Sequence, residues 1–220
     1  MRVVLMGPPG VGKGTQAELM QKVLGVPHVS TGNILRTAMG QEGSSLGEKV
    51  RGFVESGRLV PDGLMGDLIG ERLERKDAAN GFILDGFPRT LHQVSILDDV
   101  LSRLGLSLDR VLMLVVPETE IVKRLSGRRT CPSCGTVFHV ESRPPAVPGV
   151  CDTCGAALVQ RPDDREQVIR DRMKVYTDQT LPVAQAYRAK GILVEIDGLG
   201  EVDDVRARLN SGLGRTVGRS

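Results

Sequence analysis

The sequence contains no tryptophan, and aromatic residues make up only 3% of its 220 residues. Such a chain has few side chains on which nucleobases could stack, and its net charge of +2 gives no general attraction to nucleic acid. Long apolar runs are also lacking. The longest, residues 111–116, is far too short to span a membrane, and only Arg2 precedes the first apolar run, so no secretion signal is indicated. We therefore expect a cytoplasmic protein that binds neither nucleic acid nor membranes.

Short apolar segments alternate with longer amphipathic ones along the chain. Hydrophobic residues make up 40% and charged residues 25% of it, as in ordinary globular proteins. The alternation is typical of βαβ units and predicts an α/β fold with a five-stranded parallel sheet flanked by helices. The predicted strands are residues 3–6, 28–30, 82–85, 111–116 and 193–196. The predicted helices are residues 13–24, 31–39, 45–56, 62–76, 90–104, 118–126, 163–188 and 202–209.

Local signals mark several boundaries of these helices. Pro182 has no N–H group, so it should interrupt the long helix near Thr180. Residues 210–220 are rich in glycine, arginine and serine, and we expect them to be frayed. Capping-box spacing marks two helix starts, through Ser44 or Ser45 with Glu48 and through Asp163 with Glu166.

A glycine-rich stretch, GPPGVGKGT at residues 7–15, lies between the first predicted strand and the first predicted helix. Its glycines allow backbone N–H groups to converge on an anion, Lys13 adds a positive charge, and the helix directs the positive end of its dipole there. The order of strand, glycines, lysine and helix favours a phosphate-binding P-loop over a glycine turn with no ligand. The template G-x-x-x-x-G-K-[ST] fails only at its last position, where Gly14 stands and the hydroxyl follows at Thr15. The metal ion that accompanies the phosphates should therefore depend on other groups.

All four cysteines lie in two C-x-x-C pairs, at residues 131–134 and 151–154, separated by sixteen residues. This spacing predicts a four-cysteine metal site, and the glycine after each pair suits the turn that lets two thiolates converge. Four sulfur ligands leave no open position, so the metal should be structural; zinc is the expected ion, with iron as the alternative. Two disulfides are a weaker interpretation, because no secretion signal accompanies the cysteines. His139 lies between the pairs, where we expect a surface or packing role.

Two further motifs carry arginine beside predicted strand ends: DGFPRT at residues 85–90 and STGNILR at residues 30–36. Together with Gly127-Arg128-Arg129 they resemble adenylate kinase, in the long form whose lid carries a four-cysteine zinc site. The resemblance extends from residue 1 to about residue 209, with the motifs in the family's order. It implies a P-loop NTPase-type core of residues 1–30, 61–126 and 161–220. It also implies a helical NMP-binding insertion at residues 31–60 and a zinc-containing lid at residues 127–160.

The resemblance implies reversible transfer of the γ-phosphoryl group of Mg-ATP to AMP, giving two ADP. The attacking phosphate oxygen is already anionic at neutral pH, so no general base is needed. Catalysis then requires in-line positioning, and neutralisation of charge by lysine, arginine and Mg²⁺. We expect both insertions to close over the substrates and exclude water, with lid opening limiting turnover. The implied partners are ATP, AMP and ADP, and the family's usual state is a monomer.

The resemblance also assigns residues to each nucleotide. Those implied for ATP are Gly10, Gly12, Lys13, Gly14, Thr15, Arg124, Arg128 and Gly200. Those implied for AMP are Thr31, Arg36, Arg58, Val60, Gly86, Arg89, Gln93, Arg161 and Arg172. The implied catalytic residues are Lys13, Asp85, Arg89, Arg128, Arg161 and Arg172, with Asp85 holding the waters of Mg²⁺. Guanidinium groups suit bidentate phosphate binding.

Several points stay open at the level of the sequence. Gln93 has the donor and acceptor that an adenine edge requires, but local sequence fits a solvent-facing helical residue equally well. Arg124 and Arg128 are four residues apart and could share one helical face. Asn33 and Gly200 stand where the family often has Asp and Lys.

Two rival functions also remain. One is a kinase for UMP and CMP, which would use the same phosphate cradle; the long lid and Gln93 favour AMP. The other is a zinc-ribbon nucleic-acid binder with an incidental P-loop, against which the low aromatic content argues.

Overall fold

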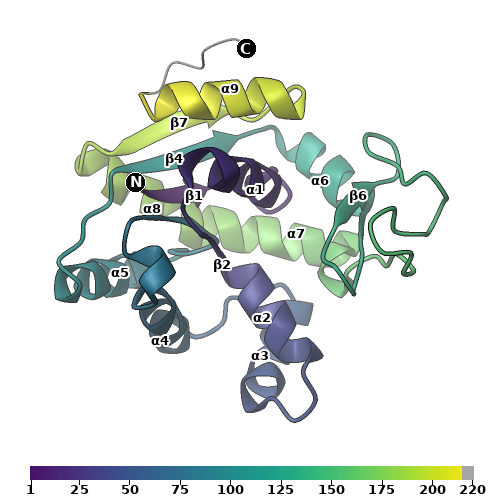
Figure 1. Ribbon diagram of the computed structural model, residues 1–220, viewed down its shortest axis with the longest axis horizontal. Helices are drawn as coiled ribbons and strands as arrows, with labels where there is room; N and C mark the ends of the chain where they lie inside the picture. Colours follow the sequence, from purple (N-terminus) through teal and green to yellow (C-terminus); the bar gives the residue numbers. More distant parts are fainter. Residues whose placement is uncertain (215–220) are drawn as a thin grey trace.

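The fold is built on a five-stranded parallel sheet with strand order β2-β3-β1-β4-β7. The computed structural model describes residues 1–214 (Figure 1). The strands are β1 (Arg2–Met6), β2 (His28–Ser30), β3 (Phe82–Asp85), β4 (Arg110–Val115) and β7 (Leu193–Asp197). All five agree with the predicted strands to within one residue at each end, and the α/β fold class is confirmed.

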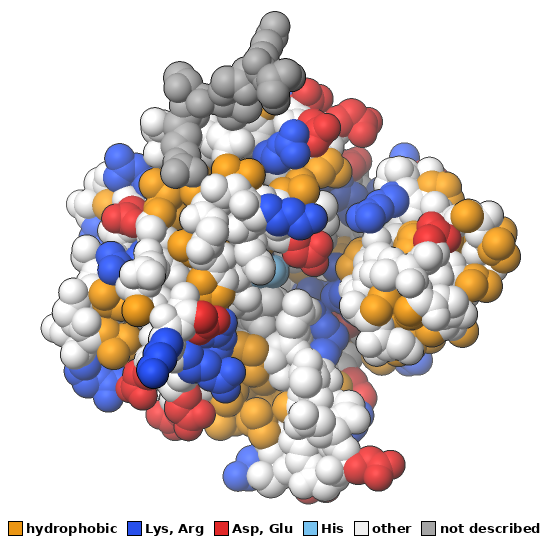
Figure 2. Space-filling view, in the orientation of Figure 1, with side chains coloured by type: hydrophobic (Ala, Val, Ile, Leu, Met, Phe, Trp, Pro, Cys, Tyr) orange, Lys and Arg blue, Asp and Glu red, His pale blue; other side chains and the backbone are white. Residues whose placement is uncertain are grey.

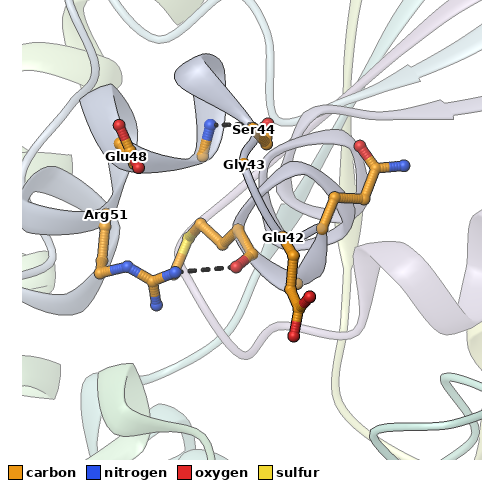
Figure 3. A pocket seen from close by; sticks show the side chains of 9 residues that line it. Glu42, Gly43, Ser44, Glu48 and Arg51 are labelled. Atoms are coloured by element: carbon orange, nitrogen blue, oxygen red, sulfur yellow. Dashed lines mark hydrogen bonds between the residues drawn. The ribbon is translucent and has the colours of Figure 1, made fainter.

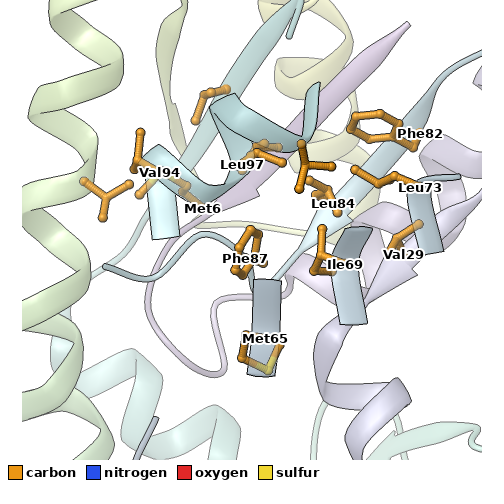
Figure 4. Close-up of a cluster of buried hydrophobic side chains, with 14 of the residues drawn as sticks. Met6, Val29, Met65, Ile69, Leu73, Phe82, Leu84, Phe87, Val94 and Leu97 are labelled. Atoms are coloured by element: carbon orange, nitrogen blue, oxygen red, sulfur yellow. The ribbon is translucent and has the colours of Figure 1, made fainter. Parts of the chain in front are cut away.

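Helices cover both faces of this sheet because the strands alternate their side chains between two apolar layers. From β1, Val4 and Met6 enter one buried cluster and Val3 and Leu5 enter the other. The first cluster, part of which Figure 4 shows, is completed by α4 (Asp62–Leu73), α5 (Leu91–Arg103) and α8 (Leu181–Ala189). The second is completed by α1 (Lys13–Leu24), α6 (Glu118–Ser126) and α9 (Val202–Gly212). The carboxyl ends of the strands are thus held on a rigid base.

The long helix predicted at residues 163–188 is divided in the structure. It consists of α7 (Glu166–Val175), a π-helical turn (Tyr176–Thr180) and α8. The interruption beside Pro182 is confirmed. The predicted start was wrong, because a 3-10 turn (Pro162–Asp164) precedes α7 and the Asp163 carboxylate accepts a hydrogen bond from Arg172 instead of capping the helix.

Other helix ends differ by a few residues from the prediction. The helix α4 ends at Leu73, and a short 3-10 turn (Lys76–Ala78) follows it. The helix α5 starts after Thr90, whose hydroxyl accepts a hydrogen bond from the backbone N–H of Gln93. The fraying expected from residue 210 was wrong as far as Gly212, where α9 ends; residues 215–220 lie outside the described part. Among residues 1–214, no helix has the length and apolar character needed to cross a membrane.

Two segments project from the sheet and its covering helices (Figure 1). Residues 31–60 contain α2 (Thr31–Gly40) and α3 (Ser45–Glu55), and the side chain of Ser44 caps α3 as predicted. Residues 127–160 contain two antiparallel strands that were not predicted, β5 (Arg128–Thr130) and β6 (Val137–His139).

Candidate functional site

The glycine-rich loop connects the carboxyl end of β1 to the amino end of α1 and places Lys13 at the start of that helix. Gly12, the residue before the helix, has φ of 104°, a conformation that L side chains rarely adopt. The Lys13 ammonium donates hydrogen bonds of 2.8 Å to the carbonyl oxygens of both Gly7 and Pro8. Burial lowers the pKa of Lys13 to about 8, although the nearby Asp85 carboxylate opposes this shift. The loop therefore wraps around a cation that is partly desolvated.

Asp85 lies at the carboxyl end of β3, beside β1 and next to the loop. A Cβ atom on Gly14 would stand 3.8 Å from its Oδ2 atom, so the missing side chain there leaves the carboxylate facing the first turn of α1. Burial alone would raise the pKa of Asp85, but the hydrogen bond with His28 and the charges of Lys13 and Arg89 outweigh it and hold the pKa below its usual value. Asp85 is therefore an anion in a basic surrounding.

His28 contacts this carboxylate and was missed from the sequence. Its Nε2 atom lies 3.2 Å from Asp85 Oδ2, and the His28 side chain is almost completely buried. The two residues are 57 positions apart and come together because β2 and β3 are neighbours in the sheet. The order of the strands in a sheet cannot be deduced from local sequence. No local signal could therefore have identified the contact between His28 and Asp85.

Five of the predicted arginines converge on the same region from five different segments. They are Arg36 on α2, Arg89 after β3, Arg128 on β5, Arg161 before α7 and Arg172 on α7. Burial lowers the pKa of Arg89 to about 10 and that of Arg161 to about 9, and neighbouring arginine charges add to both shifts. Figure 2 shows blue side chains in the hollow beside the lobe formed by residues 127–160. Cations held this close together without full hydration indicate a site for a polyanion.

Two aspartates that the sequence analysis did not single out as site residues orient two of these arginines. Asp164 is fully buried and accepts two hydrogen bonds from the Arg128 guanidinium, at 2.7 and 2.5 Å. Asp163 accepts a hydrogen bond of 2.8 Å from Arg172. The sequence signal was the adjacent Asp163-Asp164 pair, which follows the predicted site residue Arg161 closely; only Asp163 was assigned a role, as a helix cap with Glu166.

The predicted acceptor residues gather around the turn after β3. The Arg89 Nε atom donates to the Gly86 carbonyl oxygen at 2.7 Å, and the Thr31 hydroxyl donates to the Asp85 carbonyl oxygen at 3.2 Å. Val60 is buried at 5% exposure, and Gln93 is only 2% exposed, so the solvent-facing interpretation of Gln93 was wrong.

Two arginines of the 31–60 segment are held within that segment. Arg36 donates to Asn33 Oδ1 at 2.7 Å, and Arg58 is exposed, with its guanidinium 5.2 Å from the ring centroid of Phe53.

The 31–60 segment lies against α7, which carries Arg172, at Gly57. This residue has φ of 72°, and a Cβ atom built on it would lie 2.6 Å from Arg172 Cγ and 3.0 Å from Val168 Cγ1. A glycine is therefore required here both by backbone conformation and by the close approach to α7.

Arg124 binds the P-loop and the turn after β7. Its guanidinium donates to the carbonyl oxygens of Val11 in the loop and of Gly198 after β7, at 3.1 and 3.2 Å. The helix α6 ends at Ser126, so the idea that Arg124 and Arg128 share one helical face was wrong. Arg124 instead joins the P-loop to the turn that contains Gly200, whose φ is 101°. A hollow of about 440 Å³ beside this turn is lined by residues 115–117 and 195–197.

The four cysteines meet as the spacing predicted. Their sulfur atoms all lie within 4.8 Å of one another, with Cys131 to Cys154 at 3.4 Å and Cys134 to Cys151 at 3.6 Å. Four sulfurs around a tetrahedral zinc ion would lie about 3.8 Å apart, so this donor set fits zinc. The thiols are free, and the disulfide interpretation finds no support in the structure.

The rest of the lobe is small. Apart from Cys131 and Cys151, the buried hydrophobic residues of its cluster comprise only Phe138. His139 packs as expected: its ring faces Gly127, and Nδ1 accepts hydrogen bonds from the backbone of Glu141 and Ser142.

A separate pocket of about 190 Å³ lies between α2 and α3 (Figure 3). Arg51 crosses it and donates to the Met39 carbonyl oxygen at 2.8 Å. None of the predicted site residues lines it, so it is distinct from the basic hollow.

Comparison with known proteins shows that the chain is similar to the members of one family. Residues 5–192 match the family model described as adenylate kinase. The chain is 46% identical over 209 residues to an adenylate kinase of Finegoldia magna, covering 95% of this chain and 97% of the relative. It is 47% identical to one of Caldicellulosiruptor bescii, covering 97% of this chain and 99% of that protein. With an adenylate kinase of Acidothermus cellulolyticus the identity is 50%, over 94% of this chain and 95% of the relative.

Proposed function

This chain belongs to the adenylate kinase family of nucleoside monophosphate kinases, and we propose how its own residues carry out the reaction ATP + AMP to two ADP. The observation that supports the proposal is the convergence of Lys13 and five arginines on one hollow beside the P-loop, with burial lowering the pKa of Lys13 and of four of the arginines. Two nucleotides bring several negative charges together, and the excess of fixed cations offsets their repulsion.

On the donor side, the P-loop residues Gly10, Gly12, Gly14 and Thr15 would offer N–H and hydroxyl groups to the phosphates of ATP. Lys13 would exchange its bonds to the Gly7 and Pro8 carbonyl oxygens for bonds to phosphate oxygens. Arg124 would fix the turn at Gly200 against the P-loop, beside the hollow of about 440 Å³ that suits an adenine ring. This arrangement would hold both ends of ATP on elements of the sheet.

The residues beside the loop also fit the magnesium ion that ATP carries. Asp85 is a buried carboxylate with a lowered pKa, so it is ionised at neutral pH and can accept hydrogen bonds from water molecules of the metal. Mg²⁺ supplies neutralisation of the charge that develops on the transferring group. His28 would orient Asp85 for this task through their 3.2 Å contact.

On the acceptor side, Arg36 and Arg89 would hold the phosphate of AMP, and Thr31, Gly86 and Gln93 would line its base. Arg58 and Val60 would complete this pocket from the 31–60 segment. Arg128, Arg161 and Arg172 would then surround the phosphoryl group in transit. No side chain is required as a base, because the acceptor oxygen is already anionic.

The two projecting segments would act as covers over the substrates. We assign residues 31–60 as the NMP-binding domain and residues 127–160 as the lid, with residues 1–30, 61–126 and 161–220 as the core. Cys131, Cys134, Cys151 and Cys154 would hold a structural zinc ion that gives the lid its shape. We further propose a cytoplasmic monomer whose partners are ATP, AMP and ADP.

Substitution of the P-loop lysine tests the donor assignment. Lys13→Ala should lower kcat by about 100-fold or more, because one preorganised cation is lost from the transferring group. Lys22→Ala, an exposed lysine on the same helix, is the matched control and should keep full activity. Activity retained in Lys13→Ala with an unchanged circular dichroism spectrum would overturn the assignment.

A panel of acceptors tests the substrate. With Mg-ATP as donor, AMP should be phosphorylated faster than CMP, UMP or GMP in a coupled assay. Equal or faster turnover of CMP or UMP would favour the pyrimidine kinase that the sequence left as a rival.

A further inference from the structure

Asp62, the first residue of α4, makes a set of contacts with the start of α5 that the reaction itself does not require. Its Oδ1 atom accepts a hydrogen bond of 2.7 Å from the side-chain amide nitrogen of Gln93. Its Oδ2 atom accepts one of 2.9 Å from the Thr90 hydroxyl and lies 3.3 Å from His92 Nδ1. At the other end of the amide, Gln93 Oε1 accepts a hydrogen bond of 2.7 Å from the backbone N–H of Arg89.

These partners permit only one orientation of the Gln93 amide. A backbone N–H group can only donate a hydrogen bond, and an ionised carboxylate can only accept one. The amide oxygen must therefore face Arg89 and the NH₂ group must face Asp62. A rotation of 180° would place oxygen against carboxylate oxygen and one donor against another, so two hydrogen bonds would be lost at a buried position.

The packing around the two residues keeps this arrangement in place. Gln93 is 2% exposed, so water cannot readily replace the hydrogen bonds that its amide makes with Arg89 and Asp62. Met65 lies one turn after Asp62 and Val94 directly follows Gln93, and both are buried at 6% exposure in the same cluster, where Figure 4 shows them. The two helices are thus anchored beside the amide, and the distance between Asp62 and Gln93 is fixed by the core.

We propose that Asp62 is a positioning residue that makes the acceptor site selective for 6-aminopurine over 6-oxopurine monophosphates. The inference rests on the proposed role of Gln93 as a reader of the base. A glutamine amide pairs with adenine by accepting from the 6-amino group and donating to a ring nitrogen. Each amide atom keeps one free hydrogen or lone pair for this purpose. AMP has a donor at position 6 whereas IMP has an acceptor, so a fixed amide rejects IMP and a freely rotating amide would not.

The experiment compares AMP and IMP as acceptors with Mg-ATP. The two differ in the base edge at position 6, amino against oxo, and at N1, which is an acceptor in AMP and an N–H donor in IMP. In Asp62→Asn the side-chain oxygen can keep the Thr90 bond while its NH₂ group faces Gln93. Neither orientation of the Gln93 amide then satisfies both Arg89 and residue 62, so the amide is no longer fixed in one orientation. We expect the ratio of kcat/KM for AMP to that for IMP to fall roughly tenfold, mainly through the KM values. Asp67→Asn, the same change at an exposed position of α4, should leave the ratio unchanged.

Two further measurements separate the possible failures. Gln93→Leu should lower the ratio at least as much as Asp62→Asn does. If Gln93→Leu leaves the ratio unchanged, the proposed role of Gln93 is wrong. If Gln93→Leu lowers it and Asp62→Asn does not, the positioning role of Asp62 is wrong and Gln93 reads the base unaided. A purely structural role would lower Tm, or kcat/KM for both acceptors in equal proportion, and leave the ratio unchanged. An unchanged ratio in Asp62→Asn would therefore overturn the proposal.

Discussion

The two projecting segments obtain their shape from different sources. In residues 31–60, Leu35, Val50 and Val60 belong to the same buried cluster as the strands β1 and β3, so the segment shares the main core. In residues 127–160, the separate cluster contains only Phe138 besides two cysteines, which is too little apolar burial to order a lobe of this size. A metal site can replace the missing core.

Because of this difference, residues 31–60 and residues 127–160 should respond to different perturbations. A segment that shares the main core loses stability together with the whole molecule, because its apolar contacts are continuous with the sheet. A lobe held by its own cysteine site can lose its shape while the rest stays folded.

Loss of the proposed metal should have the largest effect and should act on residues 127–160 alone. Cys151→Ser takes one of four ligands from the site, and the binding free energy of such sites, about 10–16 kcal/mol in small zinc domains, is also their folding energy. We expect residues 127–160 to become sensitive to trypsin, with cleavage near Arg143. Hydrogen exchange in α2 and α3 should stay unchanged. Equal protection of the lid before and after strong chelation would contradict a structural metal.

Loss of the buried aspartate at the base of the lid should come next. Asp164→Asn removes the charge that pairs with Arg128, and breaking a buried pair typically costs about 3–5 kcal/mol. The free energy of unfolding from urea titration should fall by about this amount. Asp171→Asn, at an exposed position of α7, is the control and should change it by less than about 0.5 kcal/mol. Equal effects of the two substitutions would show that the ion pair contributes nothing.

A cavity in the 31–60 segment should have a smaller effect that does not depend on metal. Val50 is completely buried in the main cluster, so Val50→Ala should cost about 2 kcal/mol. The cost should be the same with and without chelator, since distant sites are additive. Val23→Ala, at a side chain that is 54% exposed, serves as the control. A cost that disappears after chelation would mean that the two segments are not independent.

The smallest effect concerns pH and contrasts the donor and acceptor sides. The pKa of Lys13 is lowered to about 8, so as pH rises through 8 this residue loses the proton that attracts the phosphates. The affinity for ATP should then fall by up to about tenfold per pH unit. AMP is held by arginines, of which Arg161 has a pKa of about 9 and Arg89 one of about 10, so its binding should stay unchanged until about pH 9. Calorimetric titration with each nucleotide measures this. Lys13→Arg should abolish the fall in ATP affinity, and a parallel fall for both nucleotides would contradict the assignment.

The features that could be predicted from the sequence are those that depend on residues close together in the chain. Short apolar runs located all five strands of the sheet, and the spacing of the four cysteines predicted that their sulfur atoms meet in one cluster. Pro182 marked the interruption between α7 and α8, because a missing N–H group acts on its own helix.

What escaped prediction depends on contacts between distant residues. His28 meets Asp85 only through the order of the strands, and Gln93 is buried only because Asp62 and the turn at Arg89 surround it. Asp163 resembles a helix cap in the sequence, but Arg172, a half-buried arginine nine residues later, competes for its carboxylate. Tertiary charge pairing outweighed the local capping signal at that position.

Gly57 adds a constraint on the surface where the 31–60 segment meets α7. Its Cα atom stands so close to Arg172 and Val168 that the space for one methyl group is absent. A mutation that adds a side chain here would have to push either the segment or the Arg172 side chain aside. The residue type at position 57 is therefore limited by the space available and not by contact with a substrate, and a substitution at Gly57 offers a way to disturb the acceptor side from outside the pocket.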